Sequence, residues 1–398
     1  MTRPVSGEAT ASAGAGGTRA VVMGLGYGGL NVARSLWRFG VQVDGVHRNA
    51  GTPAARSRAL TRLRVWSTDA QDADEGVDWL CALGDELGRP VLVLLDDRDA
   101  LFVARHRERL ERSFRYGFVP PELVAGLVDK AALHRLCERH GAPTPRTASA
   151  SSLDEALAFA RDVGYPLVAK GGAPFGDDPI PGTTDVPDER ALRALVARSL
   201  DRDVAPVLQE RLPAGPSNSW IYHGYFDAES RCLVGMTGVK LMQQPRHGGR
   251  TVLAESVPNR ELTEHTARLF GELGYRGVLG CDFHFDPRDG SYKLLDANPR
   301  IGANFRLSVD AGGLDIVRAA YLDLTGAVVS VGAPCVGRRW LQDGDFPASW
   351  GYVRAGELTP RRWLGSLRGV DERAWFARDD AGPFRAYVRG KVPRPWPR

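Results

Sequence analysis

The segment 280–300 restricts the fold of this chain more than any other. Two stretches in which apolar and polar residues alternate flank an Arg-Asp-Gly turn at 288–290, and this pattern predicts a β-hairpin. We expect a three-residue loop with Gly290 in the left-handed conformation, which places Asp282 opposite Asp296. Residues opposite each other share a face of the sheet, so the two carboxylates would converge. A four-residue loop would put them on opposite faces.

The hairpin carries candidate ligands for a metal ion. Asn298 lies two residues beyond Asp296 and is expected on the same face. Two carboxylates and an amide oxygen suit a hard cation, so Asp282, Asp296 and Asn298 are candidates to bind Mg²⁺, with Mn²⁺ as an alternative. Arg300 follows and could neutralise a transferring phosphoryl group or a developing oxyanion. The simpler alternative is a solvent-facing hairpin whose polar turn contains Asp286, Arg288 and Asp289.

Composition sets the class of protein around this hairpin. A chain of 398 residues, 43% hydrophobic and 25% charged, is typical of a globular protein with two or three domains. A net charge of +4 with scattered basic residues does not favour nucleic-acid binding, and no run approaches the roughly 20 apolar residues of a membrane span. The five cysteines are far apart and form no CxxC pair, which indicates a reducing cytoplasm rather than a zinc cluster or disulfide frame. We interpret residues 1–18 as a disordered tail.

A strand, a glycine-rich turn and a helix follow this tail. Residues 20–23 are apolar, the turn runs from Gly24 to Gly29, and the strand and helix order beyond it predicts a small parallel sheet. Three interpretations of the turn stay open: a tight strand-to-helix connection, a substrate carboxylate or phosphate site at the helix N-terminus, or a dinucleotide site. The glycine spacing and the lack of an acidic residue at the end of the second strand disfavour the dinucleotide site.

Two lysines and one strand end carry further candidate chemistry. Lys130 opens a helix directly after its expected N-cap, Asp129, where a cation is unfavourable with the helix dipole unless an anion lies nearby. Lys170 ends an apolar strand, as a buried phosphate contact or a snorkelling side chain would. Another apolar strand ends in Gln209 and Glu210, where free main-chain groups could recognise an adenine edge. Taken alone, each of these residues also has an ordinary structural interpretation.

The order of these residues along the chain resembles the ATP-grasp superfamily. The motifs that carry the resemblance are LVDK at 127–130, GAPTP at 141–145, YPLVAK at 165–170, QERLP at 209–213 and LLDANPR at 294–300. Within the superfamily the chain is most similar to the carboxylate–amine ligases that include D-aspartate ligase, through TGVKLMQ at 237–243, AESVPN at 254–259 and DPRDG at 286–290. The resemblance covers about residues 19–330 and is strongest from 125 to 305.

The resemblance implies a fold of the α/β and α+β classes, in which a small parallel-sheet N-terminal domain precedes a two-part ATP-grasp fold. The implied divisions are a tail at 1–18, the N-terminal domain at 19–122, a first ATP-grasp subdomain at 123–205, a second one with the metal site at 206–330 and a C-terminal extension at 331–398. The implied activity is that of an ATP-dependent ligase. It activates a carboxylate as an acyl phosphate, joins it to an amine and releases ADP and phosphate.

The resemblance also implies roles for the candidate residues. Lys130 and Lys170 would hold the ATP phosphates, and adenine would be recognised by Gln209, Glu210, Arg211 and Leu212. Mg²⁺ would be bound by Asp282, Asp296 and Asn298. The transferred phosphoryl group and the acyl phosphate would be steadied by Lys240 and Arg300. The implied substrates are a small-molecule carboxylate and an amine, and a homodimer is compatible with the resemblance.

One segment departs from the family pattern. The loop at 171–184 carries Asp177 and Asp178, which would repel phosphate, in place of the usual run of Gly, Ser and Lys residues. This departure leaves open an ATP-binding regulator with weak catalytic activity as an alternative to the ligase. The turn at 24–29 leaves open a second alternative, an NAD(P)-dependent oxidoreductase. No motif identifies the substrates, although Arg246 could hold a substrate carboxylate.

Overall fold

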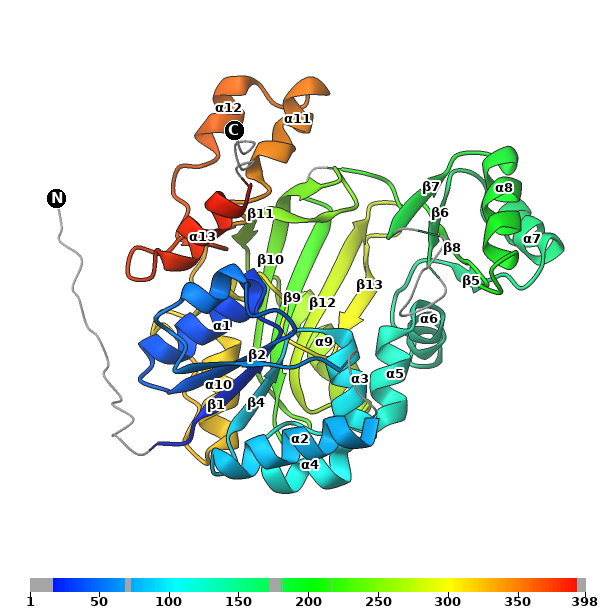
Figure 1. The fold of residues 1–398 in the computed structure, drawn as a ribbon. Helices are drawn as coiled ribbons and strands as arrows, with labels where there is room; N and C mark the ends of the chain where they lie inside the picture. Colours follow the sequence, from blue (N-terminus) through cyan, green and yellow to red (C-terminus); the bar gives the residue numbers. More distant parts are fainter. Residues whose placement is uncertain (1–16, 69–72, 172–179, 181, 216, 392–398) are drawn as a thin grey trace, which may run out of the picture.

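The computed structural model describes residues 17–68, 73–171, 180, 182–215 and 217–391. These residues form three β-sheets and a C-terminal segment (Figure 1). The N-terminal sheet (blue) packs beside the large sheet (green to yellow), and the small sheet (green) lies at the far end from the C-terminal segment (orange to red). Within the described part of the chain, no helix has both the length and the apolar character needed to cross a membrane.

The N-terminal sheet has four parallel strands in the order β3-β2-β1-β4, which confirms the predicted small parallel sheet. Strands β1 and β4 are buried along their whole length, as expected where helices cover both faces. The element bounds are β1 (Ala20–Met23), α1 (Tyr27–Arg38), β2 (Val43–His47), η1 (Pro53–Arg56), β3 (Arg62–Val65), α2 (Ala73–Glu86), β4 (Val91–Leu94), α3 (Asp97–Arg105) and α4 (Arg107–Ser113).

Close packing explains two glycines in the turn between β1 and α1. Gly24 has a φ of +91°, which side chains of the L configuration rarely adopt. A Cβ on Gly29 would lie 2.0 Å from the carbonyl oxygen of Gly24, whereas a Cβ on Gly26 would meet nothing within 4 Å. The tight strand-to-helix connection is therefore sufficient to explain Gly24 and Gly29.

The small sheet is antiparallel, with the order β5-β8-β6-β7, and packs against α7 and α8 in an apolar core of its own. Asp129 caps α6, as predicted, by accepting a hydrogen bond from the N–H of Ala132 at 2.6 Å. This cap makes Lys130 the first residue of the helix. The bounds are α5 (Pro121–Val128), α6 (Lys130–Arg139), β5 (Thr147–Ser149), α7 (Leu153–Val163), β6 (Leu167–Lys170), β7 (Thr183–Val186), α8 (Glu189–Leu200) and β8 (Val207–Glu210).

The large sheet has seven strands in the order β13-β12-β9-β10-β11-β14-β15, and only its last pair is parallel. Helices α9 and α10 pack on opposite faces, because α9 contacts the core around Tyr222 and α10 the core around Ile221. The bounds are β9 (Ser219–Phe226), β10 (Cys232–Gln244), β11 (Arg250–Ser256), α9 (Arg260–Glu272), β12 (Gly277–Asp286), β13 (Ser291–Asn298), η2 (Phe305–Leu307) and α10 (Ile316–Leu324).

The hairpin formed by β12 and β13 differs from its prediction in the loop. Asp286 pairs with Ser291, so the loop has four residues and the expected three-residue loop is wrong. Gly290 does adopt the left-handed conformation, with a φ of +72°. Counted from this loop, a regular ladder would put Asp282 and Asp296 on opposite faces of the sheet.

A β-bulge between the loop and the acidic residues changes the register. Phe283 pairs with Leu294, but the next pair is Asp282 with Asp296, so Leu295 is an extra residue on β13. The two aspartates therefore share a face of the sheet. The predicted pairing is confirmed, although a bulge produces it and a shorter loop does not.

The C-terminal segment, residues 331–391, extends the large sheet and contacts α1. Strand β14 pairs with β11, and its Trp340 is 1% exposed. The bounds in this segment are β14 (Arg339–Leu341), η3 (Phe346–Trp350), α11 (Gly351–Arg354), α12 (Pro360–Gly365), β15 (Glu372–Arg373) and α13 (Gly382–Lys391).

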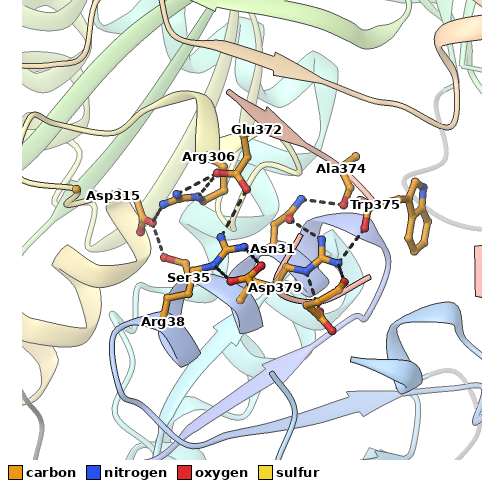
Figure 2. A network of polar contacts seen from close by, with 12 residues as sticks. Asn31, Ser35, Arg38, Arg306, Asp315, Glu372, Ala374, Trp375 and Asp379 are labelled. Carbon is orange, nitrogen blue, oxygen red and sulfur yellow. Dashed lines mark hydrogen bonds and ion pairs between the residues drawn. The ribbon is translucent and has the colours of Figure 1, made fainter. Parts of the chain in front are cut away.

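A polar network fastens the C-terminal segment to the rest of the molecule (Figure 2). Arg306, in the short helix η2 that follows β13, donates to Asp315 at 2.5 Å and to Glu372 of β15 at 3.1 Å. Arg38 at the end of α1 pairs with Asp379 at 2.8 Å. Charged groups that are this well paired fix relative positions, so the network holds α1, the turn after β13 and the C-terminal segment together.

Candidate active site

Lysines from two other elements meet the paired aspartates of the hairpin. Lys240 in β10 pairs with Asp282, with 2.8 Å between Nζ and Oδ1. Lys130 at the start of α6 pairs with Asp296. A cation at the start of a helix was expected to be unfavourable unless an anion lies nearby, and Asp296 is such an anion. The structure therefore brings these four predicted residues together on one side of the large sheet.

Arg300 is held from two sides. Its Nη2 donates to Oδ1 of Asn298 at 2.9 Å, and its Nε donates to Oδ1 of Asp97 at 2.9 Å. Asp97 is the first residue of α3, so the N-terminal sheet and its helices contribute directly to the site. The sequence analysis missed Asp97. The available signal was a pair of aspartates directly after the buried strand β4, since functional residues of parallel sheets gather at the carboxyl ends of strands.

Burial and charge act in opposite directions on the lysines. Burial lowers the pKa of Lys130, but the Asp296 carboxylate outweighs burial and leaves this pKa above its ordinary value. Burial lowers the pKa of Lys170 to about 8, and Lys170 makes no ion pair with the residues that the structure describes. Burial raises the pKa of Asp296, whereas Lys130 and the other nearby cations lower it by more. The site thus contains an ionised aspartate and one lysine that would gain from a bound anion.

The predicted adenine segment lies at the end of β8. Gln209 donates from Nε2 to Oγ1 of Thr147 at 2.9 Å, and Arg211 pairs with Asp185 of β7. Leu212 is buried. Arg211 and Leu212 lie just beyond the last pairing of β8 with β6, so their main-chain groups are outside that ladder.

Glu210 belongs to an ion-pair cluster at the tip of the hairpin. Arg288 Nη2 donates to Oε2 of Glu210 at 3.0 Å and to Oδ2 of Asp286 at 2.6 Å. Lys293 Nζ lies 2.7 Å from Asp286 Oδ2 and 3.5 Å from Glu210 Oε1. Asp286 is fully buried, so the interpretation of Asp286 and Arg288 as an ordinary polar turn is wrong. The cluster joins the small sheet to the large sheet.

Two cavities open beside the site and share a boundary. The smaller one, the small compartment, has a volume of about 230 Å³ and is lined by Lys240, Asp282, Asp296, Asn298 and Arg300 among others. The large compartment, about 710 Å³, runs along the glycine-rich turn and the start of α3. Both are lined by Tyr27, Arg250, Arg300 and Ala303. They are therefore two parts of one cleft between the N-terminal sheet and the large sheet.

His223 and Asn304 line the small compartment, and the sequence analysis missed both. His223 Nδ1 lies 2.8 Å from Oγ of Ser308, and its Nε2 lies 3.2 Å from Oδ1 of Asn304. Burial lowers the pKa of His223 to about 4, so its ring is neutral at neutral pH. Arg246, an expected substrate contact, pairs with Glu357 and lines neither compartment.

Comparison with known proteins identifies the domain that contains this site. The family model for the ATP binding domain of the carbamoyl-phosphate synthase L chain matches residues 129–323. Residues 129–323 form an ATP-grasp domain. Solved ATP-grasp structures show the same fold over 81% of this chain. They include N5-carboxyaminoimidazole synthetase from Staphylococcus aureus complexed with ADP, with a TM-score of 0.62, 13% identity and 81% of that chain covered.

Further similar proteins contain ATP-grasp domains. The biotin carboxylase domain of Hydrogenobacter thermophilus 2-oxoglutarate carboxylase, in complex with MgADP and bicarbonate, matches with a TM-score of 0.61, 16% identity and 73% of that chain covered. A carbamoyl phosphate synthase large chain section from Methanopyrus kandleri is 23% identical over 74% of this chain and 52% of its own length. D-aspartate ligase from Enterococcus faecium is 21% identical over 59% of this chain and 58% of its own length. The chain thus spans little more than half the length of these two relatives.

The donor atoms of the ATP-grasp domain fit a hard divalent cation. Asp282, Asp296 and Asn298 offer two carboxylates and one amide oxygen, all of the type that Mg²⁺ prefers. Among the described residues, no group of three or more His, Cys, Asp or Glu side chains could hold a metal by itself. Oxygen atoms of a bound nucleotide would therefore have to complete the coordination of a cation here.

Part of the predicted phosphate-binding loop of the ATP-grasp domain lies outside the described residues. This part comprises residues 172–179 and 181, which include Asp177 and Asp178. The expectation that this atypical loop weakens the phosphate contacts stays a prediction.

Proposed function

We propose that the chain is an ATP-dependent carboxylate–amine ligase. The observation that carries this proposal is the convergence of cationic side chains on three oxygen ligands beside a two-part cleft, in a domain of the ATP-binding ATP-grasp type. A carboxylate oxygen of the acid substrate attacks the γ-phosphorus of ATP, and ADP leaves to give an acyl phosphate. The nitrogen of an amine substrate then attacks the acyl carbon. An amide forms, phosphate leaves, and the amine gives up one proton to the surrounding water.

Nucleotide binding is proposed between the small sheet and the large sheet. Lys130 and Lys170 would hold the phosphates, and an anion beside Lys170 would offset the effect of burial and stabilise its charged form. The main chain of Arg211 and Leu212 would read the adenine edge. The side chains of Gln209 and Glu210, both engaged with protein partners, would keep this strand end in place.

We assign charge neutralisation at the reacting groups to five residues, which come from β10, β12, β13 and the segment after β13. Asp282, Asp296 and Asn298 would hold Mg²⁺, or Mn²⁺ in its place, and the bound cation supplies positive charge beside the phosphate oxygens. Lys240 and Arg300 would steady the transferred phosphoryl group and the acyl phosphate. The contacts with Asp97 and Asn298 hold the guanidinium of Arg300 where the two compartments meet. Phosphoryl transfer depends mainly on such positioning and charge, so this set is chemically sufficient.

The substrates are proposed to be a small-molecule carboxylate and an amine. D-aspartate ligase, a relative by sequence, carries a carboxylate substrate in its name, and this supports the proposed class without selecting a compound. The large compartment, about 710 Å³, has a volume in the range of small-molecule sites, and the small compartment adds about 230 Å³ to the same cleft. A homodimer and a cytoplasmic location stay predictions.

The glycine-rich turn gives the oxidoreductase alternative little support. Gly24 and Gly29 are explained by packing, and Asp44 of β2 is buried and paired with Arg19 at 2.7 Å rather than free for a ribose. The alternative of an ATP-binding regulator rests on Asp177 and Asp178, outside the described residues, so activity measurements have to decide it.

Calorimetric titration tests the nucleotide and metal assignments. We expect wild-type protein to bind ATP in a Mg²⁺-dependent manner, and Asp296→Asn to lose the Mg²⁺ dependence. Asp154→Asn is the matched control, because Asp154 is an exposed aspartate in the first turn of α7. Binding of NAD⁺ or NADP⁺ in place of ATP would move the function to the glycine-rich turn.

An activity screen tests the reaction itself. ADP release is measured with a panel of carboxylic acids in the presence of hydroxylamine, which converts an acyl phosphate to a hydroxamate. Acid-dependent ADP release with stoichiometric hydroxamate supports the ligase. ATP binding without ADP release across the panel would support the regulator instead.

A further inference from the structure

Tyr27 lies where the two compartments of the cleft meet. It is the first residue of α1, within the glycine-rich turn that the proposed reaction has not used so far. Tyr27 lines both compartments, together with Arg250, Arg300 and Ala303. Of these four shared residues, Tyr27 alone has a neutral polar side chain that could contact two substrates at once.

The ring of Tyr27 is held in place by the C-terminal segment. Its centroid lies 6.2 Å from that of Trp340 and 6.0 Å from that of Trp375. Trp375 in turn stacks on Tyr387 of α13, with centroids 4.6 Å apart. Aromatic pairs at these separations are favourable, so the phenol has a fixed direction. A residue fixed in this way can orient a substrate at low entropic cost.

The hydroxyl of Tyr27 makes no hydrogen bond to the part of the protein that the structure describes. Burial raises its pKa, and Arg250 and Arg300 only partly offset this effect. The phenol is therefore neutral at physiological pH, with one hydrogen to donate and a lone pair to accept. The hydroxyl is not among the buried polar atoms of the described residues that lack a partner, so it is open to the cleft and available to a bound molecule there.

The contents of the two compartments assign their substrates. The small compartment contains the candidate metal ligands with Lys240 and Arg300, so the acid is activated there. The large compartment is left for the amine, and it offers both acidic and basic side chains, which include Asp96, Asp99 and Arg48. An amine bound in the large compartment would reach the acyl carbon across the seam at Tyr27.

We propose that Tyr27 contacts the amine substrate at this seam. Its phenolic oxygen accepts a hydrogen bond from one N–H of the amine, so that the nitrogen lone pair points at the acyl carbon in the small compartment. The C–N bond forms, the bond between the acyl carbon and the phosphate oxygen breaks, and the amine proton leaves to water. Tyr27 forms no covalent bond. This inference rests on the proposed ligase function.

Tyr27→Phe tests the contact by removing one oxygen atom and keeping the ring. Tyr292→Phe is the matched control, because Tyr292 packs on Trp220 at the hairpin, away from both compartments. The acid found in the hydroxylamine screen is supplied with each common amino acid as the amine probe, and amide and ADP are both quantified. We expect Tyr27→Phe to lower kcat/KM for the amine about tenfold, the usual effect of one hydrogen bond. Hydroxylamine-supported ADP release and KM for ATP should stay within about twofold of wild type.

The outcomes separate this inference from the function on which it rests. An unchanged kcat/KM for the amine in Tyr27→Phe would overturn the proposal. So would an equal loss of hydroxylamine-supported ADP release, because it would place Tyr27 in acid activation or in general stability. A wild-type protein that releases no ADP with any acid would refute the ligase function itself, and the inference would fall with it.

Discussion

Replacing Asp380 by asparagine should show how much a buried ion pair between the C-terminal segment and α1 contributes to stability. The Asp380 carboxylate accepts hydrogen bonds from Arg34 Nε at 2.9 Å, Ser57 Oγ at 2.6 Å and the Arg58 N–H at 3.1 Å. The side chains of Arg34 and Asp380 are 1% and 2% exposed. Burial lowers the pKa of Arg34, and Asp380 acts in the opposite direction. The carboxylate therefore compensates the buried positive charge of the guanidinium.

The expected loss of stability in Asp380→Asn depends on the hydrogen bonds that Arg34 still makes in the variant. Removal of one partner of a buried ion pair typically costs about 3–5 kcal/mol. Arg34 would still donate to the carbonyl oxygens of Trp375 and residue 380, at 2.9 and 2.8 Å. We therefore expect Asp380→Asn to lower the free energy of unfolding by about 3 kcal/mol, the low end of that range. Asp379 pairs with Arg38 but is 43% exposed, so Asp379→Asn should cost less than about 1 kcal/mol.

Equilibrium unfolding in urea, followed by tryptophan fluorescence, compares the two variants. The single variant Arg34→Met and the double variant Arg34→Met with Asp380→Asn complete a double-mutant cycle. The double variant removes both charges and should lose less than the sum of the two single effects. The reasoning is refuted if Asp380→Asn costs no more than Asp379→Asn. It is also refuted if the double variant loses the sum of the two single effects, since independent contributions would mean that the ion pair is not coupled.

Two further predictions concern the cleft. Burial lowers the pKa of Lys170 to about 8, so its charge is present below that pH and lost above it. The Kd for ATP should therefore rise by up to about tenfold per pH unit above pH 8 in wild type and stay level in Lys170→Arg; calorimetry checks this, and a level wild-type profile contradicts it. Gly29→Ala should destabilise the protein by about 3 kcal/mol, because its Cβ would overlap the Gly24 carbonyl oxygen, whereas Gly26→Ala, at the N-cap of α1 with open space around its Cβ, should cost no more than about 1 kcal/mol. Thermal melting compares these variants, and equal melting temperatures would show that the turn relaxes.

Local patterns predicted the secondary structure where the signal is contained in neighbouring residues. The predicted cap at Asp129 lies directly before α6, as expected from the preference of Asp for this position. The β-bulge was not predicted, because loop length and bulge position cannot be separated by counting alternation from one end. The adjacent Leu294 and Leu295, which interrupt the alternation, were the available sign.

The residues of the candidate site also fall into two groups, those predicted from local motifs and those that only the packing of the domains reveals. Motif residues such as Lys130 and Asp296 were identified from short sequence signatures, and the structure places them in contact. Asp97 and Tyr27 reach the cleft only through the packing of the N-terminal sheet against the large sheet, and no local pattern encodes that packing. The pair of Arg34 and Asp380 joins residues 346 positions apart, a separation at which sequence periodicity carries no information.

The bulge at Leu295 lets one hairpin supply residues both to the ion-pair cluster at its tip and to the cleft. On the loop side of the bulge, the register places Asp286 and Lys293 in the cluster that ties the hairpin tip to Glu210. On the other side, a register shifted by one residue turns Asp296 toward the cleft. The strand register therefore differs by one residue on the two sides of the bulge. A change of loop length at the tip can alter the contacts between the two sheets without changing the face on which Asp282 and Asp296 lie.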